Sequence, residues 1–157
     1  MAIEIERKFL VKSDDWRRDA VGVAYRQGYL STERGRTVRV RIGGDKAFIT
    51  VKGPAGNAAR DEFEYPIPLE DAEQILDRLC HRPLIEKLRY KIPGKGVTWE
   101  VDEFQGENAG LIIAEVELQR ADQPVKLPAW IGREVTEDSR YANASLVRNP
   151  YRRWGKR

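Results

Sequence analysis

Charged residues recur at every second position in segments whose other positions are apolar. In the first of these segments, Glu4, Glu6 and Lys8 alternate with Ile3 and Ile5. Because successive side chains of a β-strand point to opposite faces, this spacing predicts a strand with one charged and one apolar face. Charges of the same sign two residues apart lie near each other on such a face and repel. If this face is buried, something must neutralise the charges.

The alternation predicts eight strands in total, over residues 3–10, 25–31, 37–42, 46–52, 60–65, 85–92, 98–104 and 111–119. Short segments with Gly or Pro separate several of them, as in hairpins, so the sheet should be mainly antiparallel. Three helices are also predicted. One is amphipathic and covers residues 69–79, a short capped one covers residues 13–16, and the third covers residues 136–146 and opens with a capping sequence.

The sign of the charged face changes from strand to strand. The acidic pairs are Glu4 and Glu6, Glu62 and Glu64, Glu100 and Asp102, and Glu115 and Glu117, and the basic positions are Lys8, Arg39, Arg41, Lys46, Lys52, Lys87, Arg89 and Lys91. An open sheet with one solvated face explains any single strand, but it gives no reason to repeat Glu-x-Glu. Eight strands can instead close into a barrel. We therefore predict an α+β fold, a mainly antiparallel, closed eight-stranded β-barrel with a charged lumen and helices packed outside.

A lumen lined by both carboxylates and basic side chains calls for a particular kind of ligand. Buried charges are costly unless they are neutralised. Divalent cations neutralise carboxylates, a polyanion neutralises Arg and Lys, and the metal bridges the two. A triphosphate with Mg²⁺ or Mn²⁺ meets both requirements.

Several short motifs occur in a fixed order along the chain. The first is Glu4-Ile5-Glu6-Arg7-Lys8, an ExExK pattern, and the later ones include Arg39-Val40-Arg41, Thr50-Val51-Lys52, Glu62-Phe63-Glu64, Glu86-Lys87-Leu88-Arg89-Tyr90, Trp99-Glu100-Val101-Asp102, Ala114-Glu115-Val116-Glu117 and Arg140-Tyr141-Ala142-Asn143. This ordered set resembles the CYTH superfamily, the triphosphate tunnel metalloenzymes. Within it the chain is most similar to the short, single-domain bacterial branch, known mainly for inorganic triphosphatase activity. The resemblance implies a CYTH domain over residues 1–147, followed by a basic C-terminal tail over residues 148–157.

The resemblance also implies roles for the charged residues. The phosphate-binding set comprises Lys8, Arg39, Arg41, Lys52, Lys87 and Arg89. The set that holds one or two divalent metals comprises Glu4, Glu6, Asp102, Glu115 and Glu117, and the supporting acids that orient the basic side chains are Glu62, Glu64 and Glu100. Tyr29 resembles a tyrosine assigned as proton acceptor in this family, and a tunnel-lining hydrogen-bond donor is an equal alternative for it. Lys8 is the second candidate catalytic residue.

The implied reaction is hydrolysis of inorganic triphosphate to pyrophosphate and phosphate, by in-line attack of a metal-activated water. A class IV adenylyl cyclase and a thiamine or nucleoside triphosphatase are alternatives within the family. No sequence feature identifies a pocket for a base, which favours the simpler substrate. A non-catalytic polyphosphate-binding or triphosphate-binding module is the alternative of another class, and the acidic set argues against it.

Composition limits the location and the partners. The chain has 28 Lys and Arg against 25 Asp and Glu, a net charge of +3 that is too balanced for a nucleic-acid-binding protein. No apolar run approaches the roughly 18 residues of a membrane helix. The N-terminus is charged where a secretory signal would be apolar, and the single cysteine, Cys80, cannot form an internal disulfide. We expect a cytoplasmic monomer or homodimer with a small-molecule substrate and without nucleic-acid or membrane partners.

Overall fold

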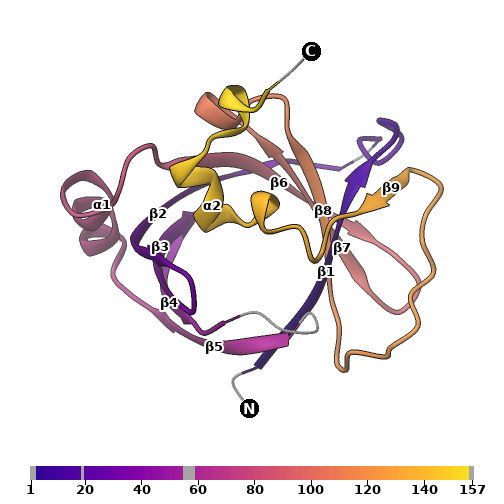
Figure 1. Cartoon of the computed structure of the whole chain (residues 1–157), viewed down its shortest axis with the longest axis horizontal. Helices are drawn as coiled ribbons and strands as arrows, with labels where there is room; N and C mark the ends of the chain where they lie inside the picture. The colour runs from indigo at the N-terminus through magenta and orange to yellow at the C-terminus, as the bar shows by residue number, and fades with distance from the viewer. Residues whose placement is uncertain (1–2, 19, 55–58, 156–157) are drawn as a thin grey trace.

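The computed structural model describes residues 3–18, 20–54 and 59–155 (Figure 1). Within these residues one sheet contains nine strands, β1 (Ile3–Val11), β2 (Val23–Glu33), β3 (Arg36–Gly43), β4 (Lys46–Lys52), β5 (Ala59–Pro66), β6 (Ile85–Pro93), β7 (Thr98–Phe104), β8 (Ile112–Glu117) and β9 (Ile131–Glu134). The helices are α1 (Leu69–Arg78) and α2 (Asn143–Arg148), with short 3-10 helices η1 (Gly106–Asn108), η2 (Ser139–Tyr141) and η3 (Tyr151–Arg153). None of these helices is long and apolar enough to span a membrane.

The sheet closes on itself, because β1 and β5 are hydrogen-bonded to each other. The strand order is β5-β4-β3-β2-β6-β7-β8-β1, and every pairing is antiparallel. The closing contact is short, with Ile3 opposite Asp61 and Ile5 opposite Ala59. The predicted closed, antiparallel barrel of eight strands is therefore confirmed.

One strand was not predicted. β9 pairs with the far end of β1, where Phe9 lies opposite Glu134 and Val11 opposite Ile131, with a register shift between these two pairs. It has only four residues and no clear alternation of polar and apolar positions. The sequence therefore carries no signal that would predict this strand.

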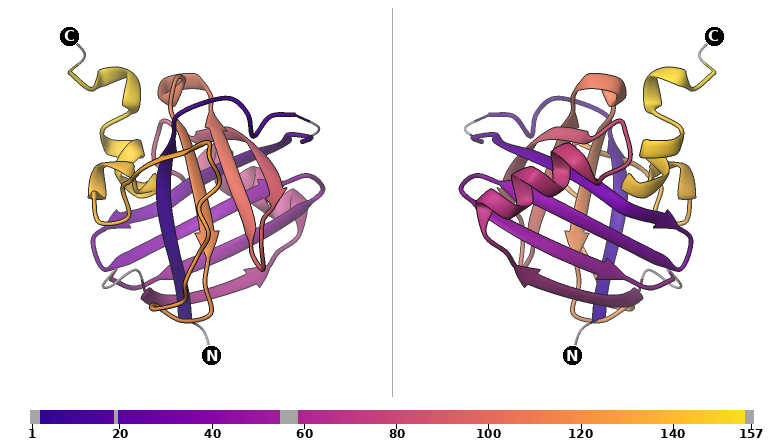
Figure 2. Two further views of the ribbon diagram at one scale, coloured as in Figure 1. Left: turned by 90° about the vertical axis from the view of Figure 1, so that its right-hand side faces the viewer. Right: turned by 90° about the vertical axis from the view of Figure 1, so that its left-hand side faces the viewer.

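Different parts of the chain cover the apolar outer face of the barrel. On one side α1 crosses the strands diagonally (Figure 2) and packs Ala72 and Leu76 against Val40 and Ala47. On the other side Trp16 and Trp130 belong to the buried cluster around Trp99 and Phe9. The segments that carry these two tryptophans are not helical. Helices therefore cover the barrel only in part.

The predicted helix over residues 13–16 is wrong. The segment forms bends and turns, in which the backbone N–H of Asp15 donates to Ser13 Oγ at 3.3 Å. Trp16 is 2 % exposed and packs edge-on against Tyr90, while Arg17 donates to Glu103 on β7. These tertiary contacts outweigh the local capping signal.

The predicted continuous helix over residues 136–146 is also wrong. It divides into η2 and α2 at Ala142, whose ψ of 138° is extended. Asp138 accepts from the backbone N–H of Arg140 and caps η2, not a longer helix. The break lets both Tyr141 and Leu146 enter one buried cluster.

The inward face of the barrel becomes apolar toward one end. Ile113 lies two residues before Glu115 on β8, and Phe104 two residues after Asp102 on β7, so each shares the inward face with a charged residue. Both belong to the buried cluster that includes Leu146 and Val147 of α2. α2 therefore packs at this end and leaves the charged part of the interior open.

Candidate active site

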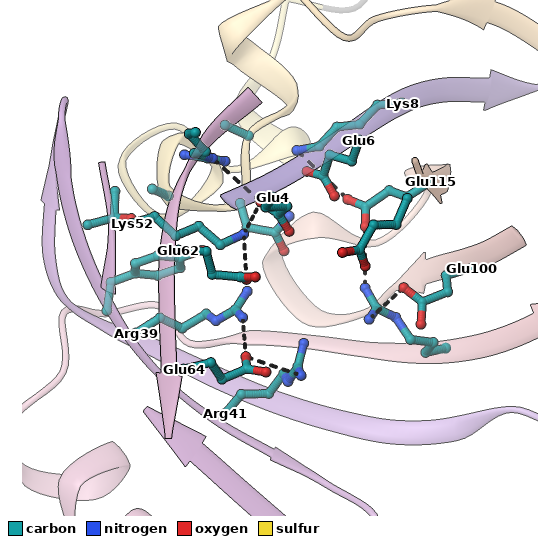
Figure 3. Close-up of a pocket in the computed structure, with 18 of the residues that line it drawn as sticks. Glu4, Glu6, Lys8, Arg39, Arg41, Lys52, Glu62, Glu64, Glu100 and Glu115 are labelled. Carbon is teal, nitrogen blue, oxygen red and sulfur yellow. Dashed lines mark hydrogen bonds and ion pairs between the residues drawn. The ribbon is translucent and has the colours of Figure 1, made fainter. Parts of the chain in front are cut away.

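The barrel encloses a charged cavity of about 190 Å³ (Figure 3). Every barrel strand contributes to its lining, and so does the start of α2. Seven basic and seven acidic side chains line it, namely Lys8, Arg39, Arg41, Lys52, Arg60, Lys87 and Arg89, and Glu4, Glu6, Glu62, Glu64, Glu100, Glu115 and Glu117. Tyr29, Thr37, Ala142, Asn143 and Ala144 complete it. Charged side chains thus make up most of the lining of this part of the lumen, as the alternation predicted.

The two signs are segregated on the barrel wall. Strands β3 and β6 bring basic but no acidic side chains to the cavity, while β7 and β8 bring only acidic ones. On the neighbouring strands β7, β8 and β1, Glu6 lies opposite Glu117, and Glu100 lies opposite Glu115. Directly opposed like charges on neighbouring strands are destabilising. One side of the cavity therefore accumulates negative charge, and the other positive charge.

Lys52 and Arg60 hold Glu4 where β1 meets β5. Lys52 Nζ lies 2.9 Å from Glu4 Oε1 and 3.8 Å from Glu62 Oε2, and Arg60 Nε lies 3.7 Å from Glu4 Oε1. Burial alone would raise the pKa of Glu4, but the positive charges of Lys52 and Arg60 outweigh it and lower that pKa. Glu4 is therefore ionised and already paired.

The two arginines of β3 that line the cavity, Arg39 and Arg41, share a single acidic partner. Arg39 Nη2 and Arg41 Nη2 lie 3.6 and 3.8 Å from the same oxygen of Glu64. Burial, together with the positive charges of Arg39 and Arg89, lowers the pKa of Arg41. The Nε of Arg39 is buried and has no hydrogen-bond partner among the described residues. This wall carries more positive charge than Glu64 can balance.

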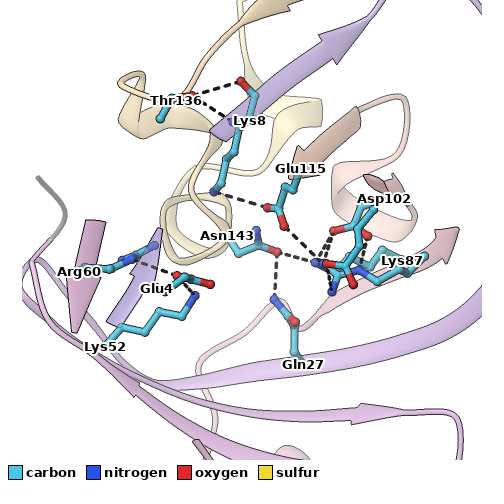
Figure 4. A network of polar contacts seen from close by, with 12 residues as sticks. Glu4, Lys8, Gln27, Lys52, Arg60, Lys87, Asp102, Glu115, Thr136 and Asn143 are labelled. Atoms are coloured by element: carbon cyan, nitrogen blue, oxygen red, sulfur yellow. Dashed lines mark hydrogen bonds and ion pairs between the residues drawn. The ribbon is translucent and has the colours of Figure 1, made fainter. Parts of the chain in front are cut away.

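Asp102 lies behind the cavity and not on its surface. It is 1 % exposed, and its carboxylate accepts from Arg89 Nε at 2.7 Å and Nη2 at 2.9 Å, with Lys87 Nζ 2.8 Å away (Figure 4). Burial would raise the pKa of Asp102, but these two cations lower it strongly. Burial lowers the pKa of Lys87 to about 8, against the pull of Asp102. Asp102 therefore fixes two cations that face the lumen.

Glu6 and Glu117 are carboxylates without a cation. Neither forms an ion pair within 4 Å with any described residue, although Lys8 and Arg89 pair with the neighbouring Glu115 at 3.8 and 3.5 Å. Burial and the charge of Glu115 raise the pKa of Glu6 to about 7. Burial and the charges of Glu4, Glu62 and Glu100 raise the pKa of Glu117. Both groups would be stabilised by an added cation.

The carboxylate oxygens of the cavity are chemically suited to bind a hard divalent cation. Mg²⁺ and Mn²⁺ prefer carboxylate oxygens, and Mg²⁺ keeps several of its waters. Among the described residues no three acidic, histidine or cysteine side chains are gathered closely enough to form a ready metal site. The residues therefore fit a cation that is held by few protein ligands and completed by water and substrate oxygens.

Of the predicted site residues, the structure brings all but Asp102 to the cavity. The predicted metal set is thereby divided, since Glu4, Glu115 and Asp102 are engaged by basic side chains and Glu6 and Glu117 are not. Tyr29 is 5 % exposed and lines the cavity from β2. Lys8 forms an ion pair with Glu115. Burial alone would lower the pKa of Lys8, but the negative charges of Glu115 and Glu6 outweigh burial and raise that pKa.

Among the lining residues that were not predicted as site residues, Arg60 and Asn143 form hydrogen bonds or ion pairs within the site. Arg60 stands two residues before Glu62 on β5, so the same alternation that found Glu62 and Glu64 could have found it. Asn143 is the first residue of α2 and reaches the lumen only because the chain is extended at Ala142. No periodic signal marks Asn143, and the only sequence signal that includes it is the Arg140-Tyr141-Ala142-Asn143 motif of the family resemblance.

Comparison with known proteins identifies the family. The model of the CYTH domain matches residues 2–151. An inorganic triphosphatase from Acetivibrio thermocellus is 53 % identical over 152 residues, which cover 97 % of each chain. The chain belongs to the CYTH domain family. A second inorganic triphosphatase, from Nitrosomonas europaea, is 40 % identical over 150 residues, with 92 % of this chain and 96 % of that protein covered.

Solved CYTH-like structures show the same architecture. A crystal structure of an inorganic triphosphatase has a TM-score of 0.66 and 36 % sequence identity, and the match covers 94 % of this chain and 95 % of that one. A putative adenylate cyclase from Bacillus halodurans has a TM-score of 0.63 at 16 % identity, a likeness that concerns the fold alone. The CYTH fold of this chain is therefore shared by proteins with different names.

Proposed function

We propose that this CYTH protein hydrolyses inorganic triphosphate to pyrophosphate and phosphate with a divalent cation in its tunnel. The segregation of charge in the cavity carries the proposal. A basic wall with too few acidic partners suits a polyanion, and the uncompensated pair of Glu6 and Glu117 suits a cation. The inorganic triphosphatases of A. thermocellus and N. europaea, 53 % and 40 % identical to this chain, support the substrate.

The basic residues would bind and orient the phosphate chain. Arg39, Arg41 and Arg89 offer planar forks that match phosphate oxygens in pairs, and the lysines supply compact positive charges. Glu64 keeps Arg39 and Arg41 in place. Asp102 does the same for Arg89. A chain of phosphates held on several sides leaves its terminal phosphorus open to in-line attack by water.

We assign the metal to Glu6 and Glu117, with Glu4 and Glu115 next to them on the same strands. When bound, Mg²⁺ or Mn²⁺ would neutralise phosphate oxygens and lower the pKa of a coordinated water. Lys8 stays protonated and binds phosphate on this assignment, because the charges of Glu115 and Glu6 raise its pKa. Tyr29 remains the candidate proton acceptor, and Tyr29→Phe tests it.

Several predictions from the sequence stay predictions. They are the cytoplasmic location, the monomeric or homodimeric state, the lack of nucleic-acid and membrane partners, and the boundary between a domain over residues 1–147 and a basic tail over residues 148–157. The choice between Mg²⁺ and Mn²⁺ belongs with them. Among the described lining residues Tyr29 is the only aromatic side chain, which gives a nucleotide base little to stack on and favours inorganic triphosphate over a cyclase substrate.

Phosphate release tests the proposal. Tripolyphosphate, ATP and pyrophosphate are each incubated with Mg²⁺, Mn²⁺ or EDTA, using the parent, Glu6→Gln and the control Glu103→Gln. Glu103 lies on β7 beside Asp102 but pairs with Arg17 outside the barrel. We expect metal-dependent release from tripolyphosphate that Glu6→Gln loses and Glu103→Gln keeps. Cyclic AMP from ATP would indicate a cyclase, binding without turnover would indicate a binding module, and no response at all would refute the proposal.

A further inference from the structure

One uncharged side chain enters the tunnel from the segment that packs at its apolar end. Asn143 begins α2, whose Leu146 and Val147 are buried in the cluster at that end. Its amide oxygen accepts hydrogen bonds from Gln27 Nε2 at 2.9 Å and from Lys87 Nζ at 3.1 Å (Figure 4). The side chain is therefore tied to two strands of the barrel, β2 and β6, as well as to its own helix.

These two bonds fix which way the amide faces. An ammonium group has only donors, so Lys87 can meet the oxygen of Asn143 but not its nitrogen. Gln27 also uses its amide nitrogen as the donor, and it is fully buried. The two N–H groups of Asn143 Nδ2 must then point the other way. In Figure 4 the nitrogen lies on the side of the amide away from Gln27.

The Nδ2 group of Asn143 has no hydrogen-bond acceptor among the described residues and is open to the cavity. Asn143 lines the cavity, no described residue accepts a hydrogen bond from its nitrogen, and that nitrogen is not among the buried atoms without a partner. Two free donors therefore face the lumen beside Lys87. An ionised phosphate oxygen is the acceptor that this lumen would supply, and hydrogen bonds to ionised acceptors are the strong ones.

We propose that Asn143 is a further substrate-contacting residue, which donates a hydrogen bond from Nδ2 to an oxygen of the bound phosphate chain. This inference rests on the proposed function. Because Asn143 is neutral, it adds a donor without adding to the repulsion that already lowers the pKa of Arg41 on the basic wall. Because its oxygen is held by Lys87 and Gln27, the donor is in place before the substrate arrives, which reduces the entropy lost on binding.

A double-mutant cycle separates direct contact from an effect through Lys87. Tripolyphosphate binding is measured by calorimetry in EDTA for the parent, Asn143→Ala, Lys87→Met and the double variant, and KM is measured with Mg²⁺. We expect Asn143→Ala to weaken binding by about 10-fold to 100-fold, the range for one hydrogen bond to a charged group. Asn143 and Lys87 touch each other, so their effects should be partly coupled, but a substantial part of the loss should persist in the Lys87→Met background because Nδ2 contacts the substrate directly.

Two results would overturn the contact. If Asn143→Ala leaves affinity and KM unchanged, Nδ2 makes no bond to substrate. If its effect vanishes in the Lys87→Met background, Asn143 is a positioning residue for Lys87. Ser145→Ala, on the same helix, is the control for disturbance of α2 and should keep affinity within about 2-fold, and melting curves check folding. A parent that neither binds nor hydrolyses tripolyphosphate would instead refute the proposed function.

Discussion

Replacing Asp102 with Asn removes the carboxylate that holds Lys87 and Arg89. The change is nearly isosteric. Lys87 and Arg89, which are only 2 % and 8 % exposed, would then have a neutral amide in place of their carboxylate partner. Removing one member of a buried ion pair typically costs about 3–5 kcal/mol of unfolding free energy. At about 2–4 °C per kcal/mol for a chain of this length, the melting temperature should fall by about 6–20 °C.

Thermal melting in EDTA measures this loss without any contribution from metal binding. Glu117→Gln is the matched control, because the pKa of Glu117 is raised by burial and by neighbouring carboxylates. An ionised group with a raised pKa destabilises the folded state, so its removal should leave the melting temperature unchanged or higher. The two acidic residues, both predicted as metal ligands from the sequence, should therefore behave in opposite ways.

A direct metal contact of Asp102 would give a different result. If Asp102→Asn melts within about 2 °C of the parent and instead loses Mn²⁺ binding, Asp102 is a metal ligand and not the anchor of two cations. A cycle with Lys87→Met adds a second check, because residues in direct contact should show a coupling of about 0.5–3 kcal/mol. Additive losses of stability would contradict the 2.8 Å contact between Asp102 and Lys87.

Other changes test the fold and the basic wall. Gly28→Ala should destabilise by about 1–3 kcal/mol in chemical unfolding, because its Cβ would lie 2.7 Å from the Cys80 side chain, and an unchanged midpoint would contradict this packing. Hydrogen bonds from Arg17 lower the pKa of Glu103, so this pair stabilises the fold above the ordinary pKa of 4.5, and its contribution is lost as the pH falls below that value. Glu103→Gln should remove about 0.2–1 kcal/mol of unfolding free energy at neutral pH and less in acid. An unfolding free energy whose pH dependence is the same in the variant and the parent would count against this pair. Arg41→Lys should raise KM for tripolyphosphate several-fold with little change in melting temperature, because it removes a planar fork from a crowded wall, and an unchanged KM would remove Arg41 from the binding set.

Much of the site could be predicted because one physical rule governs it. The period of two in a strand decides which side chains share a face, and closure of eight strands turns that face inward. Glu4, Glu6 and Lys8 on β1, and Arg39 and Arg41 on β3, therefore reached the cavity as expected. The buried charges themselves pointed to a metal-bound polyanion, and the family resemblance agreed with that ligand and added the reaction and the roles of individual residues.

The positions of Asp102 and Asn143 could not be predicted from the alternation, because they depend on how the charged part of the lumen ends. Asp102 shares the inward face of β7 with Glu100, but Phe104 follows two residues later and Ile113 lies opposite Asp102, so the lumen is already apolar there. A hydrophobic residue at that spacing is the signal that could have separated Asp102 from the other acids. Asn143 could not be predicted in the same way, because its position depends on the extended Ala142.

Anomalous scattering from crystals grown with Mn²⁺ and tripolyphosphate would locate both the metal and the phosphate chain. We expect a manganese peak within ligand distance of the carboxylates of Glu6 and Glu117, with phosphate density against Arg39, Arg41 and Arg89. A peak at Asp102, or manganese and phosphate bound only outside the barrel, would contradict this expectation.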